Sequence, residues 1–425
     1  MSQQTTAPHA VAHTEIKPKP SWKWPIVTAL MAVATILLAS GTAGDAVFSM
    51  QGATSWFAIP NIVLPAGTTN LVLAVLAVVA ALYITVIALR RGAVPTWPVV
   101  VAGLALVIAF LSWTVAGNDG ASIPVMRLLG GAITFAVPLA FGALSAVVCE
   151  RSGIINISIE GQMIAGAFAA VILSSAFGNP WLGLISAPIA GVAVAALLAV
   201  FAIRYRVDNI IVGVVLNMLA IGLTSFLFSM LFTGGTAYLN QALSLPNLPI
   251  PLLVGIPVIG PVLFNQSILV YLVYVLVVVL HVLLFRSRWG LHTRSVGEHP
   301  KAADTVGIQV NALRWRNVLL GGALAGMGGA MFTIGMGLAF SKNMVAGNGF
   351  IALAAMILGG WRPFGAAMAA LLFGFATNLG FIIQTVDAPI PTEVVLMIPY
   401  LVTILAVGGF VKSAIAPAAV GKPYP

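Results

Sequence analysis

Two polar stretches stand out in an otherwise apolar chain, and one of them is GEHPKAADTVGI at 297–308. Pro300 suits the first turn of a helix, Ala302 and Ala303 are small, and Gly307 can end the helix. The pattern predicts a short helix over 300–306 that is small enough to seat in a groove on a partner protein. Composition alone favours an ordinary solvated loop instead.

The other stretch is ERSGIINISIEGQM at 150–163, in which Glu160 is the most informative residue. Glu160 opens a hydrophobic segment, where an ionised carboxylate is costly unless it has a partner or access to water. Two structural roles are open to it: an ion pair with Arg151, or a cap on the helix that follows. Alternatively, its carboxylate faces a pathway through the protein and binds a ligand.

The sequence contains no arrangement of residues that is typical of catalysis. It has no Gly-x-x-x-x-Gly-Lys-Ser/Thr loop for nucleotide phosphates and no His-Glu-x-x-His pair, and Cys149 is its single cysteine. No run of acids in the apolar segments suggests a proton relay. We therefore expect neither an enzyme, nor a metal site, nor a cofactor.

The composition places most of the chain in a membrane. Of its 425 residues, 60% are hydrophobic and only 7% are charged, whereas about a quarter of a soluble domain is charged. So few charges cannot cover so large an apolar mass, which excludes a water-soluble enzyme. A membrane-spanning helix needs roughly 20 apolar residues, so the chain is predicted to be an all-α polytopic membrane protein.

Apolar runs between short polar stretches predict eleven spans and one doubtful segment. The doubtful segment, 349–360, is short and flanked by glycines, so it suits a broken or re-entrant helix. The predicted spans are 24–44, 69–90, 97–117, 128–149, 161–178, 181–203, 210–232, 266–286, 316–337, 364–384 and 392–411.

Loop charge predicts the orientation, because Lys and Arg are retained on the cytoplasmic side of a membrane. With twelve crossings and a cytoplasmic N-terminus, 17 of the 19 basic residues lie in the cytoplasm and only Arg127 and Lys342 lie outside. Both termini are then cytoplasmic. The net charge of +9 is dispersed over separate loops, so it indicates topology and not nucleic acid binding.

Both polar stretches resemble motifs of one family. Gly297-Glu298-His299-Pro300, the paired alanines and Gly307-Ile308 resemble the coupling helix of ABC importer permeases in the branched-chain amino acid and simple-sugar permease family, although Asn is usual at His299. The stretch 150–163 resembles the signature of the branch that pairs with lipoprotein receptors for nucleosides. The resemblance covers roughly 128–411 and favours a coupling helix at 297–307 over a solvated loop.

The resemblance implies a division of the chain and a set of partners. A cytoplasmic tail at 1–22 and a three-span extension at 23–127 precede the permease core at 128–411, which contains a coupling loop at 286–316; a cytoplasmic tail at 412–425 follows. The implied partners are an ATP-hydrolysing subunit at the coupling loop, a second homologous permease chain and an external substrate-binding lipoprotein. The implied activity is inward transport of nucleosides or nucleobase compounds across the cell membrane.

Several polar and aromatic residues are candidates for the substrate pathway. Asn217 and Asn378 lie within predicted spans, and amides can both donate and accept hydrogen bonds to a base or a sugar. Packing between helices is the commoner role of such groups. A nucleobase could also stack on an aromatic ring. The remaining candidates are Glu160, Phe141, Phe350 and Trp361.

Two other functions stay open from the sequence. A permease for simple sugars such as ribose is the nearest alternative within the same family. An ion-coupled secondary transporter is the alternative from another class; few buried ionisable groups argue against proton coupling, although backbone carbonyls could hold sodium.

Overall fold

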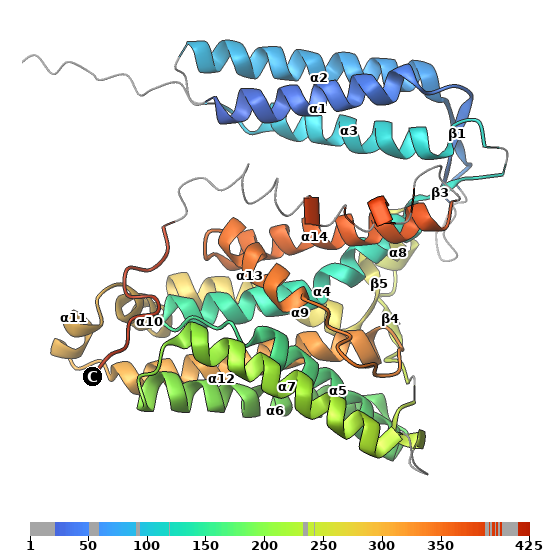
Figure 1. Cartoon of the computed structure of the whole chain (residues 1–425). Helices are drawn as coiled ribbons and strands as arrows, with labels where there is room; N and C mark the ends of the chain where they lie inside the picture. The colour runs from blue at the N-terminus through green and yellow to red at the C-terminus, as the bar shows by residue number, and fades with distance from the viewer. Residues whose placement is uncertain are drawn as a thin grey trace, which may run out of the picture. The chain divides into compact units, whose positions relative to one another are not determined.

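The computed structural model of the chain is built almost entirely from helices (Figure 1). It describes residues 22–50, 59–90, 94–118, 120–232, 237–241, 243–386, 391, 393–395, 397, 400–401 and 415–425. The chain divides into two compact units, one formed by residues up to 47 with 63–120, and the other by 48–62 with 121–425. The two units are described separately below.

The first unit is a bundle of three helices, α1 (Lys23–Ser40), α2 (Ala66–Leu89) and α3 (Trp97–Val115). Two short strands, β1 (Asp45–Ser49) and β2 (Ile62–Pro65), lie between α1 and α2 in the sequence. Small side chains allow the helices to approach closely. The buried Asn70 amide on α2 donates to Thr42 Oγ1 at 2.9 Å and to the carbonyl oxygen of Ala109 at 3.3 Å. These hydrogen bonds join α2 to α3 and to the residues just after α1.

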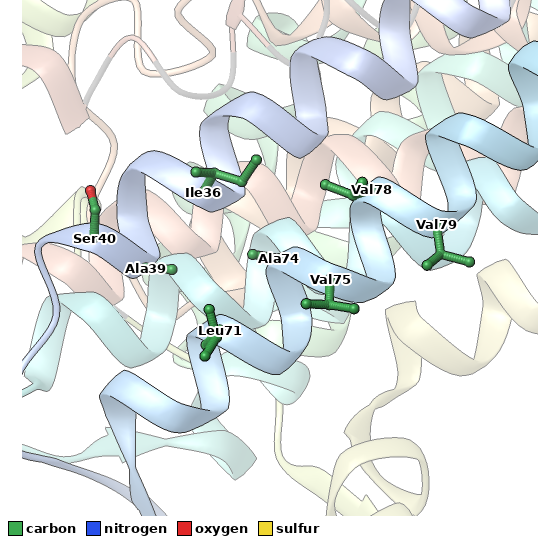
Figure 2. A pocket seen from close by; sticks show the side chains of 8 residues that line it. All are labelled: Ile36, Ala39, Ser40, Leu71, Ala74, Val75, Val78 and Val79. Carbon is green, nitrogen blue, oxygen red and sulfur yellow. The ribbon is translucent and has the colours of Figure 1, made fainter.

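A shallow groove of about 380 Å³ runs between α1 and α2 (Figure 2). Apart from the hydroxyl of Ser40, its lining is aliphatic, with Ile36, Leu71 and Val75 among the side chains. Such a surface suits acyl chains of the bilayer, and its one polar group, the Ser40 hydroxyl, donates to the carbonyl of Leu37 in its own helix.

The second unit contains the remaining helices and three very short strands. In chain order the elements are β3 (Ile123–Pro124), α4 (Val125–Arg151), α5 (Ile159–Phe177), α6 (Pro180–Ala199) with a π-helical turn (Val200–Arg204), α7 (Asn209–Phe232), β4 (Asn247–Pro249), α8 (Ile259–Phe264), β5 (Asn265–Ser267), α9 (Ile268–Arg286), α10 (Arg288–Glu298), α11 (Pro300–Thr305), α12 (Val310–Ala330) with a π-helical turn (Met331–Gly335), α13 (Asn348–Leu358) and α14 (Pro363–Gln384). Three-residue 3-10 turns lie at Ala237–Leu239 and Leu253–Gly255.

Helix α4 is the centre of the second unit. It is buried along most of its length against α12, α13 and α14 (Figure 1). It is apolar on all sides, as a helix enclosed by others must be. Its contact with α14 depends on Gly374, where an added Cβ would meet the backbone of Ala132 and Ala136.

Helix α12 packs through the small residues that recur along it every four positions. An added Cβ at Gly322 or Gly326 would overlap α6 at Ala195 or at the Ala187 carbonyl, and one at Gly329 would overlap the Met163 carbonyl of α5. These glycines bring the three backbones into direct contact. Gly322 and Gly326 therefore face α6, whereas Gly329 faces α5.

The predicted all-α membrane architecture is confirmed, with ten helices in the described part of the chain that are long and apolar enough to span a bilayer. Their bounds agree with the predicted spans to within a few residues, except that α12 begins at Val310 instead of 316. The predicted span 392–411 lies mostly outside the described residues. The even crossing count and the cytoplasmic termini therefore stay predictions.

The doubtful segment at 349–360 forms α13, whose 11 residues give a length of about 16 Å. This is half of the roughly 30 Å hydrocarbon thickness. Trp361, in the turn before α14, is nevertheless bonded to Arg151 at the end of α4. Helix α12 starts next to that same end, where Arg314 is bonded to Ser152. With its π-helical turn, α12 leads away from this end for 26 residues. The chain therefore returns from the end of α12 toward that end of α4 through turns and irregular backbone at 336–347 followed by α13.

Candidate functional site

The chain after α4 folds back into the unit before α5 begins. The amide of Asn156 donates to Ser145 Oγ at 3.1 Å and to Gln162 Oε1 at 3.0 Å, and Gln162 in turn donates to Ser158 Oγ at 2.9 Å. All four side chains are buried, and their hydrogen bonds are made within this group. The network fixes irregular backbone at 152–158 beside α4, so that α5 starts at the depth of Gly142, inside the apolar layer.

Glu160 holds the N-terminus of α13. Its two carboxylate oxygens accept the backbone N–H groups of Gly347 and Gly349, each at 2.7 Å. A helix N-terminus has N–H groups without intrahelical partners and a partial positive charge, so a buried carboxylate is favourable there. Of the roles left open by the sequence, the hydrogen bonds of Glu160 go neither to Arg151 nor to the N–H groups of α5 but to α13, far along the chain, although Glu160 itself lies in the first turn of α5. Its pathway role stays a prediction.

The other end of α13 is held by the two residues that begin the same motif. Arg151 Nε donates to the carbonyl oxygen of Trp361 at 2.9 Å, and the Trp361 indole Nε1 donates to Glu150 Oε2 at 2.6 Å. Trp361 is 6% exposed and has a φ of 54°, a strained conformation for a bulky residue. Residues of the stretch 150–160 are therefore hydrogen-bonded at both ends of the short helix.

The two candidate asparagines are used in structural hydrogen bonds. Asn217 accepts the N–H of Gly161 at 2.8 Å and donates to the carbonyl of Ile157 at 2.9 Å, which fixes the start of α5. Asn378 donates to the carbonyls of Arg127 and Leu128 at 3.1 and 2.7 Å, which joins α14 to the start of α4. Their pathway role stays a prediction.

The candidate aromatic residues differ in their surroundings. Phe141 is fully buried in the core and Trp361 is bonded to Glu150, whereas the Phe350 ring on α13 is 50% exposed. Phe350 lies next to the Gly349 that Glu160 caps. Of the three, it has the free surface on which a ligand ring could stack.

The coupling stretch forms a pair of helices, α10 and α11. Pro300 begins α11, Ala303 is its buried contact, and Gly307 follows it with a φ of 86°, so the residues that predicted a short helix occupy the expected positions. Ala302 is exposed and Val306 is 75% exposed. Gly297 packs on the Arg151 carbonyl, and Glu298 accepts the backbone N–H of Ala418 at 3.1 Å.

Polar side chains connect α10 to the start of α12, and the start of α12 to the turn after α4. Trp289 Nε1 donates to Asn317 Oδ1 at 3.1 Å, and Asn317 donates to Thr293 Oγ1 at 3.2 Å. Arg314 is 1% exposed, and its Nε donates to the carbonyl of Ser152 at 3.1 Å. The region 286–316 is therefore not a loop, because α10 and the first turns of α12 lie within it.

Sequence reasoning missed these connecting residues. Arg314 and Asn317 lie next to the predicted boundary of a span, where Arg and Asn are ordinary, so composition gave no signal. The pairing of Glu150 with Trp361 joins residues 211 positions apart, which sequence spacing does not indicate.

Among the described residues there is no group of His, Cys, Asp and Glu that could hold a metal ion.

The second unit thus combines apolar helices of membrane-spanning length with the helix pair α10 and α11, which is bonded to its core. Residues 128–407 match the family model described as branched-chain amino acid transport system / permease component, so the chain belongs to this family. The family and the ten apolar helices together make it a multi-pass protein of the cell membrane.

The chain is similar to permeases of known systems. The nucleoside ABC transporter permease protein NupC of Lactococcus lactis is 39% identical over 70% of this chain and 96% of its own length. The guanosine ABC transporter permease protein NupQ of Bacillus subtilis is 41% identical over 69% of this chain and 94% of its own length. The glucose ABC transporter permease protein TsgB13 of Haloferax volcanii is 29% identical over 56% of this chain and 65% of its own length. No solved structure matches the chain.

Proposed function

We propose that this chain is the permease subunit of an ATP-driven importer that carries nucleosides or related nucleobase compounds into the cell. The observation that carries the proposal is the agreement between two relatives named for nucleoside and guanosine transport, each matched over nearly its whole length. The scarcity of buried charge in the second unit suits a neutral, polar substrate.

The energy source in this proposal is a separate ATP-hydrolysing subunit that seats on α11. Ala302 on α11 and Val306 directly after it form an exposed apolar edge, which is unusual on a polar surface and suits a groove on another protein. Movement of α11 would pass through α10 to Asn317 on α12, and from Arg314 on α12 to the turn after α4. That turn lies between the residues that hold the two ends of α13. The second permease chain and the external lipoprotein receptor belong to the same proposal.

Uptake into proteoliposomes tests the function. The chain is reconstituted with the second permease, the ATP-hydrolysing subunit and the receptor encoded alongside it, and radiolabelled guanosine, adenosine, cytidine, ribose and glucose are compared. Nucleoside uptake that requires ATP supports the proposal. Uptake of ribose or glucose alone would support the sugar alternative, for which a glucose permease is a more distant relative. Uptake by the purified chain alone, driven by an ion gradient, would contradict the ATP-driven function.

A further inference from the structure

The C-terminal residues 415–425 lie along the coupling element instead of forming a free tail. Pro417 and Ala419 are buried, and the N–H of Ala419 donates to the carbonyl of Gly297 at 2.9 Å. In Figure 1 the dark red end of the chain runs beside α10 and α11. These residues are called the C-terminal strap below.

Besides α10, the strap is bonded to three further elements. Next to the α10 contact, the N–H of Gly421 donates to the carbonyl of Gly153 at 2.9 Å, which reaches the turn after α4. Arg314 Nη1 of α12 donates to the carbonyl of Lys422 at 3.1 Å. The Tyr424 hydroxyl donates to Asp304 Oδ2 of α11 at 2.9 Å. The bond to Asp304 raises the pKa of the Tyr424 phenol, so the phenol is protonated and able to donate at neutral pH.

Helix α11 needs such support. It has six residues, and an isolated helix of that length is unstable in water. Its single buried residue, Ala303, packs in a small cluster with Val296 and Val310, and the Tyr424 side chain packs against that cluster. The strap therefore supplies both a hydrogen bond and apolar cover to a helix that cannot hold its own position.

Local geometry shows that the strap and its seat fit closely. Gly421 has a φ of 73°, and an added Cβ there would meet Ile155 Cδ1 at 2.8 Å. Gly153 has a φ of 94°, and an added Cβ would lie 2.7 Å from Arg314 Nη2 and 3.3 Å from the Ala419 carbonyl. Larger residues at either position would displace the strap from the turn.

We propose that the C-terminal strap is a positioning element that fixes α11 to α10, to the turn after α4 and to the start of α12, so that all four move as one body. The further consequence, that a push on α11 is delivered to the membrane helices only when the strap is seated, rests on the proposed function. The positional role itself does not depend on it.

Amide hydrogen exchange of the purified full-length chain in nanodiscs tests the strap. The variants are a chain that lacks 415–425, and Gly421→Val, which keeps the length of the chain. The matched control is Lys422→Ala, because this side chain is exposed and its carbonyl makes the bond. We expect amides 300–308 to exchange about tenfold faster in the deletion and about fivefold faster in Gly421→Val. Amides within α4 should keep the wild-type rate, which shows that the fold is intact.

The outcomes separate the two proposals. Unchanged exchange at 300–308 in the deletion would overturn the strap, whatever the chain transports. Faster exchange, together with ATP-driven uptake that falls at least fivefold in the deletion, supports both the strap and its role in coupling. Faster exchange in a chain whose wild type shows no ATP-driven uptake keeps the strap and rejects the proposed function.

Discussion

The carboxylate of Glu160 lies 2.7 Å from the backbone nitrogen of Gly347, so the start of α5 fixes the start of a helix 187 positions further along the chain. The second oxygen bonds to Gly349. A charge that would be costly within an apolar layer is therefore balanced by the N–H groups of a half-length helix. This relationship makes the position of α13 depend on α5.

Replacing Glu160 should release α13. In Glu160→Gln, the amide can accept one N–H group but has no second acceptor, so one buried N–H loses its partner. We expect a loss of about 1–3 kcal/mol in the free energy of unfolding, measured by thermal or denaturant unfolding in detergent. Glu393→Gln, at an exposed carboxylate, serves as the control and should change stability by less than about 0.5 kcal/mol. Equal effects of the two variants would contradict the capping role.

The bond between Trp361 and Glu150 can be tested by a double-mutant cycle. Trp361→Phe keeps an aromatic ring but removes the N–H, which leaves a buried carboxylate unpaired, and should destabilise the chain by about 2 kcal/mol. In the Glu150→Gln background the same change should cost less, because a neutral amide tolerates burial better. Additive effects would show that the two side chains do not interact. Trp97→Phe, at an exposed tryptophan, is the control for ring loss.

The close contact between α12 and α6 predicts a sharp size limit. Gly326→Ala places a Cβ against the carbonyl of Ala187 and should cost about 1–3 kcal/mol through overpacking. Gly222→Ala on α7 introduces the same atom where no other atom lies within 4 Å, so it should be neutral or slightly stabilising. Unfolding midpoints of the two variants provide the comparison. Similar midpoints would mean that the α12 contact is looser than described.

The exposed edge of α11 should govern assembly and not stability. Val306→Asp alters a side chain that is 75% exposed, so we expect a stability change within about 0.5 kcal/mol. Co-purification of the ATP-hydrolysing subunit should nevertheless fall at least tenfold, because a charge enters an apolar contact. Val207→Asp, between α6 and α7, is the matched control. Normal assembly of Val306→Asp would move the docking surface away from α11.

Phe350 offers a test of the pathway. Its ring is half exposed, so Phe350→Ala should leave the unfolding midpoint nearly unchanged. If a nucleobase stacks on this ring, the KM for uptake should rise about 5- to 150-fold, since one base–aromatic contact contributes about 1–3 kcal/mol. Phe350→Tyr retains the stacking face and should restore uptake. An unchanged KM in Phe350→Ala would remove this residue from the pathway.

The sequence was sufficient to predict the features that depend on local pattern. Membrane helices follow from runs of apolar residues, and α11 follows from Pro300, the paired alanines and Gly307. The short length of α13 could be expected from the glycines at 347, 349, 359 and 360. These features are set by neighbours in the chain, so spacing reveals them.

The features that the sequence could not reveal depend on distant partners. None of the roles left open for Glu160 names Gly347, to which it bonds because the fold brings the irregular segment 336–347 to the start of α5. The strap looked like a free tail because its contacts are mostly backbone hydrogen bonds, which leave no mark on composition. Long-range backbone pairing requires the structure.

The hydrogen bonds at the two ends of α13 also fix the length of this helix. Glu160 and the pair Glu150–Arg151 belong to one short stretch fixed along α4. The distance between the residues that bind the two ends of α13 is therefore constant. One residue added to α13 would lengthen it by about 1.5 Å and rotate its end by about 100°. Only one end could then remain bound. The number of residues between Gly347 and Trp361 is therefore constrained as tightly as their chemistry.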